Sequence, residues 1–169
     1  MPLPLLVANG NDAQTTWDTF VERRNGLTNR MQMHVCDGCD ECGLRCMDGF
    51  TVSQHEWEAV QTYLASQPPE EVARVQTQVK TAPWPGAAES GVPEATVSYC
   101  PFRDMEKGNC SIYPVRPTVC RLFGHTSWLP CPIGAVTRYP EGAPELWGEY
   151  RTFERRTFVE WQARKEKDF

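Results

Sequence analysis

Four cysteines lie within eleven residues of this chain in the spacing C-x2-C-x2-C-x3-C: Cys36, Cys39, Cys42 and Cys46. Turns that leave two residues between cysteines can direct both sulfurs at one point, as a thiophilic metal requires. Structural zinc and cubane iron–sulfur clusters both accept four thiolates, and the spacing does not choose between them. The sequence therefore predicts a metal centre; the alternative, paired disulfides, is typical of small secreted domains.

The length and charge of the chain limit its fold and its partners. Its 169 residues fit one domain, 1–169, with a modest core. A net charge of −5 argues against a nucleic-acid partner, which needs a basic face. No apolar run approaches the roughly 20 residues that span a bilayer, and residues 3–8 lack the charged start of a secretory signal. We therefore expect a cytoplasmic protein, where cysteines are ligands more often than disulfides.

The first half of the chain carries helical patterns on both sides of the cysteine run. Residues 12–33 predict an N-terminal helix capped by Asp12 or Thr15, with core positions at Trp17, Phe20, Val21 and Met31. Residues 53–56 have the form of a capping box and predict a helix ending near residue 66, with Trp57, Val60 and Leu64 on its buried face. Pro69 can begin the next helix, which we expect to reach residue 80 with Val72, Val75 and Val79 on one face.

The second half predicts less regular structure. Residues 82–94 are rich in Pro, Gly and Ala and predict an irregular loop. Residues 96–99 suit a short strand, and residues 104–109 suit the turn of a hairpin that returns through 111–113. A short helix is expected from Pro117, and a continuous helix from 144 to 165 within the C-terminal region 144–169. The predicted fold class is mainly α with a small β-hairpin, loop-rich and organised around a cysteine-ligated metal in residues 34–131.

A second set of four cysteines lies in this irregular half: Cys100, Cys110, Cys120 and Cys131. Their intervals of ten, ten and eleven residues form no local chelating turn, so tertiary structure must bring them together. We expect Cys100 and Cys110 on the two arms of the hairpin, and Cys120 near a helix N-terminus, where the helix dipole lowers the pKa of a thiol. A single buried cysteine usually packs as a small apolar residue, but four such cysteines beside a four-cysteine run are more simply explained as metal ligands.

Two stretches closely resemble the signature of the YkgJ-like cysteine-cluster family, also called CxxCxxCC: Cys-Pro-Phe at 100–102 and Gly-Asn-Cys-Ser-Ile-Tyr-Pro-Val-Arg-Pro-Thr-Val-Cys-Arg-Leu-Phe at 108–123. The first motif of that family, C-x2-C-G-x-C-C, is similar to residues 39–46. Arg45 stands at the third cysteine of that motif, and Cys36 is additional. The resemblance spans roughly residues 36–131. It implies a cysteine-ligated zinc or iron centre and no settled activity.

Charge limits how eight thiolates can be used. Four thiolates around Zn²⁺ or a [4Fe-4S]²⁺ core leave −2, whereas eight around one such centre leave −6. Either there are two centres, or some cysteines stay protonated or support the ligands through hydrogen bonds. Five basic residues near the cysteines in sequence are candidates to offset this charge: Arg45, Arg103, Lys107, Arg116 and Arg121. Among the histidines, His125 is a candidate to bind the metal or to hydrogen-bond a sulfur.

Three functions fit these residues: an iron–sulfur protein for redox or partner chemistry, a zinc-stapled module that binds a protein partner, and metal storage or delivery. The all-cysteine donor set favours an iron–sulfur cluster, [4Fe-4S] in particular, with zinc as the alternative. No phosphate-binding loop and no catalytic Ser/His/Asp or Cys/His spacing is found, so an enzymatic activity stays open. We further expect Cys36 to replace the cysteine absent at Arg45; the alternative is that Cys36 is a spare thiol and Cys120 completes the site.

Overall fold

The computed structural model describes residues 10–167, without the side chains of 10–15, 44 and 45. The lead-in at residues 1–9 lies outside these residues. Six α-helices carry most of the regular structure: α1 (Gly10–Thr28), α2 (Gln54–Ser66), α3 (Pro69–Gln76), α4 (Thr118–Leu122), α5 (Ala143–Tyr150) and α6 (Phe158–Lys167). Three 3-10 turns accompany them: η1 (Met33–Cys36), η2 (Glu41–Arg45) and η3 (Tyr113–Val115). The predicted class, mainly helical and loop-rich, is confirmed.

The strands form four separate antiparallel pairs: β1 (Val52–Ser53) with β8 (Arg155–Arg156), β2 (Thr81–Pro83) with β3 (Thr96–Ser98), β4 (Arg103–Asp104) with β5 (Asn109–Cys110), and β6 (His125–Thr126) with β7 (Leu129–Pro130). The predicted hairpin is present as β4–β5, but its second arm begins at Asn109 and not at residue 111. The predicted strand at residues 96–99 is present as β3, but its pairing with β2 was not predicted, because a long irregular loop separates the two.

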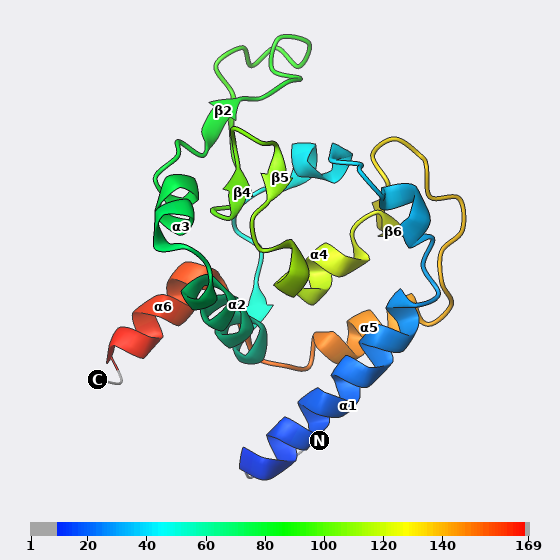
Figure 1. The fold of residues 1–169 in the computed structure, drawn as a ribbon. Coiled ribbons are helices and arrows are strands. Elements are labelled where there is room, and N and C mark those ends of the chain that lie inside the picture. Colours follow the sequence, from blue (N-terminus) through cyan, green and yellow to red (C-terminus); the bar gives the residue numbers. More distant parts are fainter. Residues whose placement is uncertain (1–9, 168–169) are drawn as a thin grey trace, which may run out of the picture.

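Helix α1 lies beside α5 at one end of the molecule (Figure 1). Trp17 and Phe20 are buried against Leu146 and Tyr150 of α5, which confirms that the aromatic face of α1 is core. The expected caps are wrong, because the helix already begins at Gly10 and both Asp12 and Thr15 lie within it. It also ends at Thr28 and not at residue 33, since turn hydrogen bonds replace the helical ladder there.

Helix α2 begins as its sequence predicts. The hydroxyl of Ser53 accepts the Glu56 backbone N–H, and the Glu56 carboxylate accepts the Ser53 N–H, so the capping box is confirmed. Pro69 is the first residue of α3, also as predicted. The expected buried position of Val79 is wrong: α3 ends at Gln76, and the Val79 side chain is 77% exposed.

The predicted continuous C-terminal helix is wrong. The chain leaves α5 at Tyr150, pairs β8 with β1, and starts again as α6. A second capping box explains the restart, because the Thr157 hydroxyl accepts the Glu160 N–H while the Glu160 carboxylate accepts the Thr157 N–H. Trp161 then reaches back over β1, where its indole N–H donates to the carbonyl of Val52 at 2.9 Å.

The carboxylate of Glu56 ties these elements together. It is 4% exposed and accepts hydrogen bonds from the Thr118 N–H and hydroxyl, both at 2.6 Å, and from the Tyr150 hydroxyl. Arg24 lies 3.8 Å away. Because these partners come from α1, α4 and α5, the N-terminus of α2 fixes where α4 sits, and α4 carries Cys120.

Candidate metal centre

The cysteine run folds as a series of tight turns in η1 and η2. The N–H of Cys39 donates to the carbonyl of Cys36 at 3.1 Å, and the N–H of Cys46 donates to that of Gly43 at 3.3 Å. Gly38, which lies between Cys36 and Cys39, has a positive φ of 69°, a conformation that glycine adopts without strain. The run therefore curls on itself, as the two-residue spacing predicts.

The second set of cysteines comes from separate elements that converge on this run. The N–H of Cys100 donates to the carbonyl of Cys46 at 2.9 Å, next to the bridge between Met47 and Tyr99. Cys110 lies on β5, whereas Cys100 precedes β4 instead of lying on it. Cys120 lies on α4, and Cys131 directly follows β7. All eight cysteines are free thiols.

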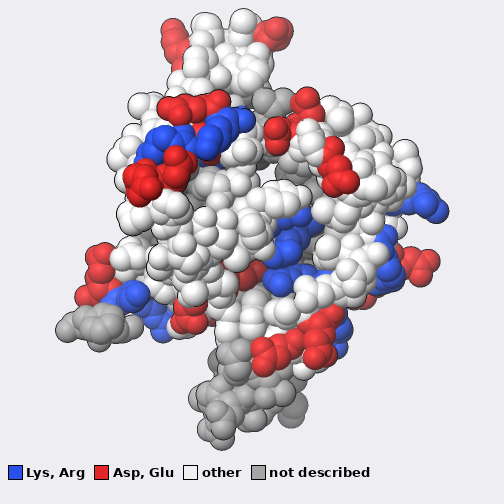
Figure 2. All heavy atoms as spheres, viewed as in Figure 1, with Lys and Arg blue, Asp and Glu red and all other residues white. Residues whose placement is uncertain are grey.

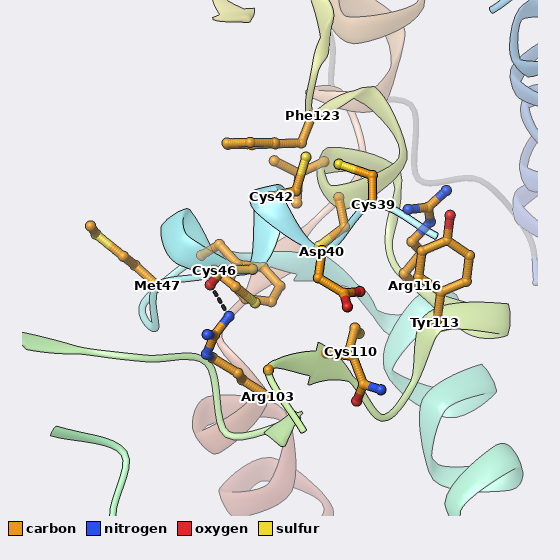
Figure 3. A pocket seen from close by; sticks show the side chains of 16 residues that line it. Cys39, Asp40, Cys42, Cys46, Met47, Arg103, Cys110, Tyr113, Arg116 and Phe123 are labelled. Atoms are coloured by element: carbon orange, nitrogen blue, oxygen red, sulfur yellow. Dashed lines mark hydrogen bonds between the residues drawn. The ribbon is translucent and has the colours of Figure 1, made fainter. Parts of the chain in front are cut away.

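A cavity of about 380 Å³ opens among these segments (Figure 3). The side chains of Cys39 and Cys42 lie on its Phe123 side, while Cys46 and Cys110 lie on the side of the β4–β5 hairpin. Cys120 also borders it. The remaining wall combines apolar side chains with the charged side chains of Asp40, Arg103 and Arg116.

A smaller cavity of about 70 Å³ lies behind η1. The sulfur of Cys36 is 3.4 Å from Nε2 of His125 in this region, so the imidazole does lie against a cysteine sulfur, one of the two roles considered for it. Five cysteines border the smaller cavity: Cys36, Cys39, Cys42, Cys120 and Cys131.

Burial and the neighbouring thiols keep most of the cysteines protonated. Burial, with the thiols of Cys131, Cys36 and Cys39, raises the pKa of Cys42 to about 11. Burial likewise raises the pKa of Cys110 to about 11. It also raises the pKa of Cys120, so the expected lowering is wrong: α4 is one short turn, and desolvation outweighs its dipole.

Two thiols have a lowered pKa. The Cys46 sulfur shares a hydrogen bond with the Cys100 thiol, which lowers the pKa of Cys46 and raises that of Cys100. Burial acts to raise the pKa of Cys131, but backbone N–H groups directed at its sulfur outweigh burial and lower it; they belong to Val136, Ile133, Ala135 and Gly134. An irregular stretch is expected around Cys131 from its prolines, but these N–H contacts were not predicted, although Pro132 and Gly134 directly after Cys131 are turn residues.

Three side chains that line the cavities have a buried nitrogen without a hydrogen-bond partner among the described residues: Nε of Arg103, Nε of Arg116 and Nδ1 of His125. Arg116 borders both cavities and stacks on Tyr113, with 3.9 Å from its guanidinium carbon to the ring centroid. Burial raises the pKa of Cys36 and of Cys110, and the charge of Arg116 offsets part of this rise. Figure 2 shows Lys or Arg atoms at the floor of a hollow in this face, surrounded by uncharged surface.

These donors fit a thiophilic metal in their chemistry. Cysteine thiolates are soft ligands for zinc and for iron–sulfur clusters, and unpaired N–H donors beside them suit an anionic metal–thiolate centre. Within residues 10–167, no three His, Cys, Asp or Glu side chains are already arranged to hold a metal ion. Binding would therefore require the thiol side chains to turn toward a common point and to release their protons.

The sequence profile of one known family matches residues 35–156, which include all eight cysteines and most of the helical frame. The chain belongs to the CxxCxxCC family. That family is described as a "putative zinc- or iron-chelating domain", and the resemblance expected over residues 36–131 is confirmed. No curated protein and no solved structure gives a significant match. None of the described helices is long and apolar enough to cross a membrane.

The predicted ligands of the CxxCxxCC domain do not all border a cavity. Seven of the eight cysteines border a cavity, and Cys100 is buried beside Cys46. The side chain of Arg45 lies outside the described part of the chain. Replacement of the missing family cysteine by Cys36 stays a prediction. Its neighbours are now defined, since Cys36 lies beside His125 and Cys39.

Proposed function

We propose that this CxxCxxCC protein is a metal-binding protein of the cytoplasm that carries an iron–sulfur cluster for redox or partner chemistry. The observation that carries the proposal is the gathering of five of the eight free thiols around a cavity of about 380 Å³ that two arginines also line. A single zinc ion held by four thiolates needs no such space, whereas a cubane cluster with its inorganic sulfides does. When bound, such a cluster supplies one-electron transfer.

The residues of this chain would do three things for that group. The cysteines bind it, and Arg116 and Arg103 offset the −2 charge of a four-thiolate centre. The guanidinium Nε groups are free to donate to sulfur, and hydrogen bonds to cluster sulfurs are among the features that set a cluster's reduction potential. Phe123, Phe50 and Met47 restrict water at the cavity wall.

Zinc is the second candidate, and a specific feature favours it. The second cavity is only about 70 Å³, a size that suits a single ion, and the segments around it have little apolar core of their own. A zinc ion there would staple loops that serve as a binding surface for another protein.

Metal analysis of oxygen-free protein, with a visible spectrum, tests the proposal. We expect brown protein that contains iron and acid-labile sulfide in equal amounts. Colourless protein with stoichiometric zinc would replace the iron–sulfur function by the zinc module. Protein that holds neither metal after expression in iron- and zinc-supplemented medium would overturn metal binding altogether.

A further inference from the structure

The eight cysteines fall into two groups of four when their neighbours are traced. The first, which we call the outer group, meets around Gly124. A Cβ at Gly124 would lie 3.7 Å from the sulfur of Cys42 and 3.8 Å from the Cα of Cys131, so these two cysteines flank the glycine. Gly124 has a φ of 84°, which lets the chain turn between them.

Cys36 and Cys39 join the outer group from the same side. Cys36 contacts His125, the residue after Gly124, and His125 pairs with Pro130 in the β6–β7 hairpin, directly before Cys131. The N–H of Cys39 donates to the carbonyl of Cys36. The smaller cavity is bordered by all four members of the outer group and by Cys120, and Cys39 and Cys42 also border the large cavity. The outer group is therefore Cys36, Cys39, Cys42 and Cys131.

The inner group is built on the β4–β5 hairpin and α4. The backbone N–H of Cys100 bonds the carbonyl of Cys46, and their thiols are hydrogen-bonded to each other. Cys46 and Cys110 pack against the buried cluster that contains Cys100. Cys120 borders the large cavity together with Cys46 and Cys110. The inner group is therefore Cys46, Cys100, Cys110 and Cys120.

We propose that the protein has two separate four-cysteine metal sites, one formed by each group. The proposal rests on the metal-binding function proposed above and adds the division of ligands. It places Cys36 in the outer site as a full ligand, and it divides the cysteine run between sites after Cys42. Two sites at −2 each avoid the −6 of a single eight-thiolate centre, and Arg116 lies between them.

Pairs of substitutions distinguish this division from a single shared site. The probe is Co²⁺ titrated into the full-length, metal-stripped chain without oxygen, because cobalt–thiolate absorption reports bound thiolates directly. We expect two equivalents in the unsubstituted chain and one in Cys131→Ala or Cys110→Ala. The same-group pair Cys36→Ala/Cys131→Ala should still bind one equivalent, whereas the cross-group pair Cys131→Ala/Cys110→Ala should bind none.

Equal loss in the same-group and cross-group pairs would overturn the division, as would one equivalent in the unsubstituted chain. Failure of the unsubstituted chain to bind Co²⁺ would instead overturn the metal-binding function, so the two failures differ. If a variant does not fold, alkylation of the unsubstituted holoprotein during stepwise chelation gives a second test. Cysteines of one group should become reactive together, and a first reactive set that mixes the groups would overturn the proposal.

Discussion

The buried polar groups around Glu56 and those around the cysteines differ in their hydrogen-bond partners. Glu56 is a buried carboxylate whose oxygens are satisfied by donors from its own chain, including Thr118 and Tyr150. The cysteine region instead holds protonated thiols beside basic nitrogens that lack partners among the described residues. The Glu56 carboxylate has its partners within the chain, although Nε of the neighbouring Arg24 has none among the described residues, whereas the thiols lie beside several such unpaired nitrogens.

The difference separates two sources of stability. Helices α1 and α5 share an apolar core, and Glu56 at the start of α2 is hydrogen-bonded to α4 and α5. Cys46, Cys100 and Cys110 belong to a second apolar cluster, but the loops that carry the other cysteines have short strands and contribute few residues to the buried clusters, so a bound metal would hold these loops together. The two regions meet at α4, where Thr118 binds Glu56 and Cys120 faces the cavity.

Metal removal should have the largest effect. Structural zinc supplies about 10 kcal/mol or more in small metal-dependent domains, and each kcal/mol shifts the melting temperature by about 2–4 °C in a domain of this size. We expect chelation to lower the melting temperature by at least about 10 °C in circular dichroism melts.

Hydrogen exchange should then show where the loss occurs. Residues 33–46 and 118–131 should lose protection, while α1 and α2 keep theirs. Equal melting temperatures with and without metal would contradict this prediction, because they would show that the cysteine region does not depend on metal for its stability.

Substitution of Glu56 should have an intermediate effect: it should lower the stability of the fold without removing the metal. Glu56→Ala leaves the buried N–H of Thr118 and the hydroxyl of Tyr150 without their acceptor, at a cost of about 3–5 kcal/mol in the free energy of unfolding. Urea denaturation measures this loss, and folded protein should keep its metal content. Glu58→Ala on the exposed face of the same helix is the control, with a change of at most about 0.5 kcal/mol. Equal effects of the two substitutions would contradict the role assigned to the Glu56 network.

Asp104 should have the smallest effect, and a pH-dependent one. The Arg74 guanidinium holds the pKa of this buried carboxyl well below its usual range, so ionised Asp104 stabilises the fold. That contribution is complete above the unfolded pKa of about 3.9 and is lost as the pH falls through the lowered folded value. Asp104→Asn should cost about 2 kcal/mol at pH 7, and its difference from the unsubstituted chain should shrink below about pH 4.

The control for this prediction is Glu106→Gln, which removes the exposed partner of the same arginine and should cost less than about 1 kcal/mol. A difference between Asp104→Asn and the unsubstituted chain that does not change with pH would show that the ionised carboxylate is not what stabilises the hairpin.

Local signals in the sequence predicted a good part of the frame. The capping box at Ser53, the proline that begins α3 and the aromatic face of α1 act within a few residues of one another, so the sequence displays them directly. The capping box at Thr157 is a signal of the same kind. It was overlooked because the apolar residues from Leu146 to Trp161 also fit one long helical stripe.

The arrangement of the site could not be predicted in the same way. The eight cysteines were identified from their spacing and from the family resemblance, but their neighbours depend on contacts across the chain. Cys131 reaches Cys42 only because β6 and β7 fold back around Gly124. The pKa of Cys120 is likewise set by burial beneath other segments, which its position on a helix does not reveal.

The chain order of the cysteines bears on how the protein would acquire its metals. With two sites as proposed, the loop closed by Cys46 and Cys120 is nested inside the loop closed by Cys42 and Cys131. Closing a flexible loop costs roughly 0.6 kcal/mol more for each doubling of its length. Capture of either metal leaves only residues 43–45 and 121–130 for the other site to span, so each site lowers the cost of closing the other. The order of synthesis distinguishes them, because all four inner cysteines leave the ribosome before Cys131.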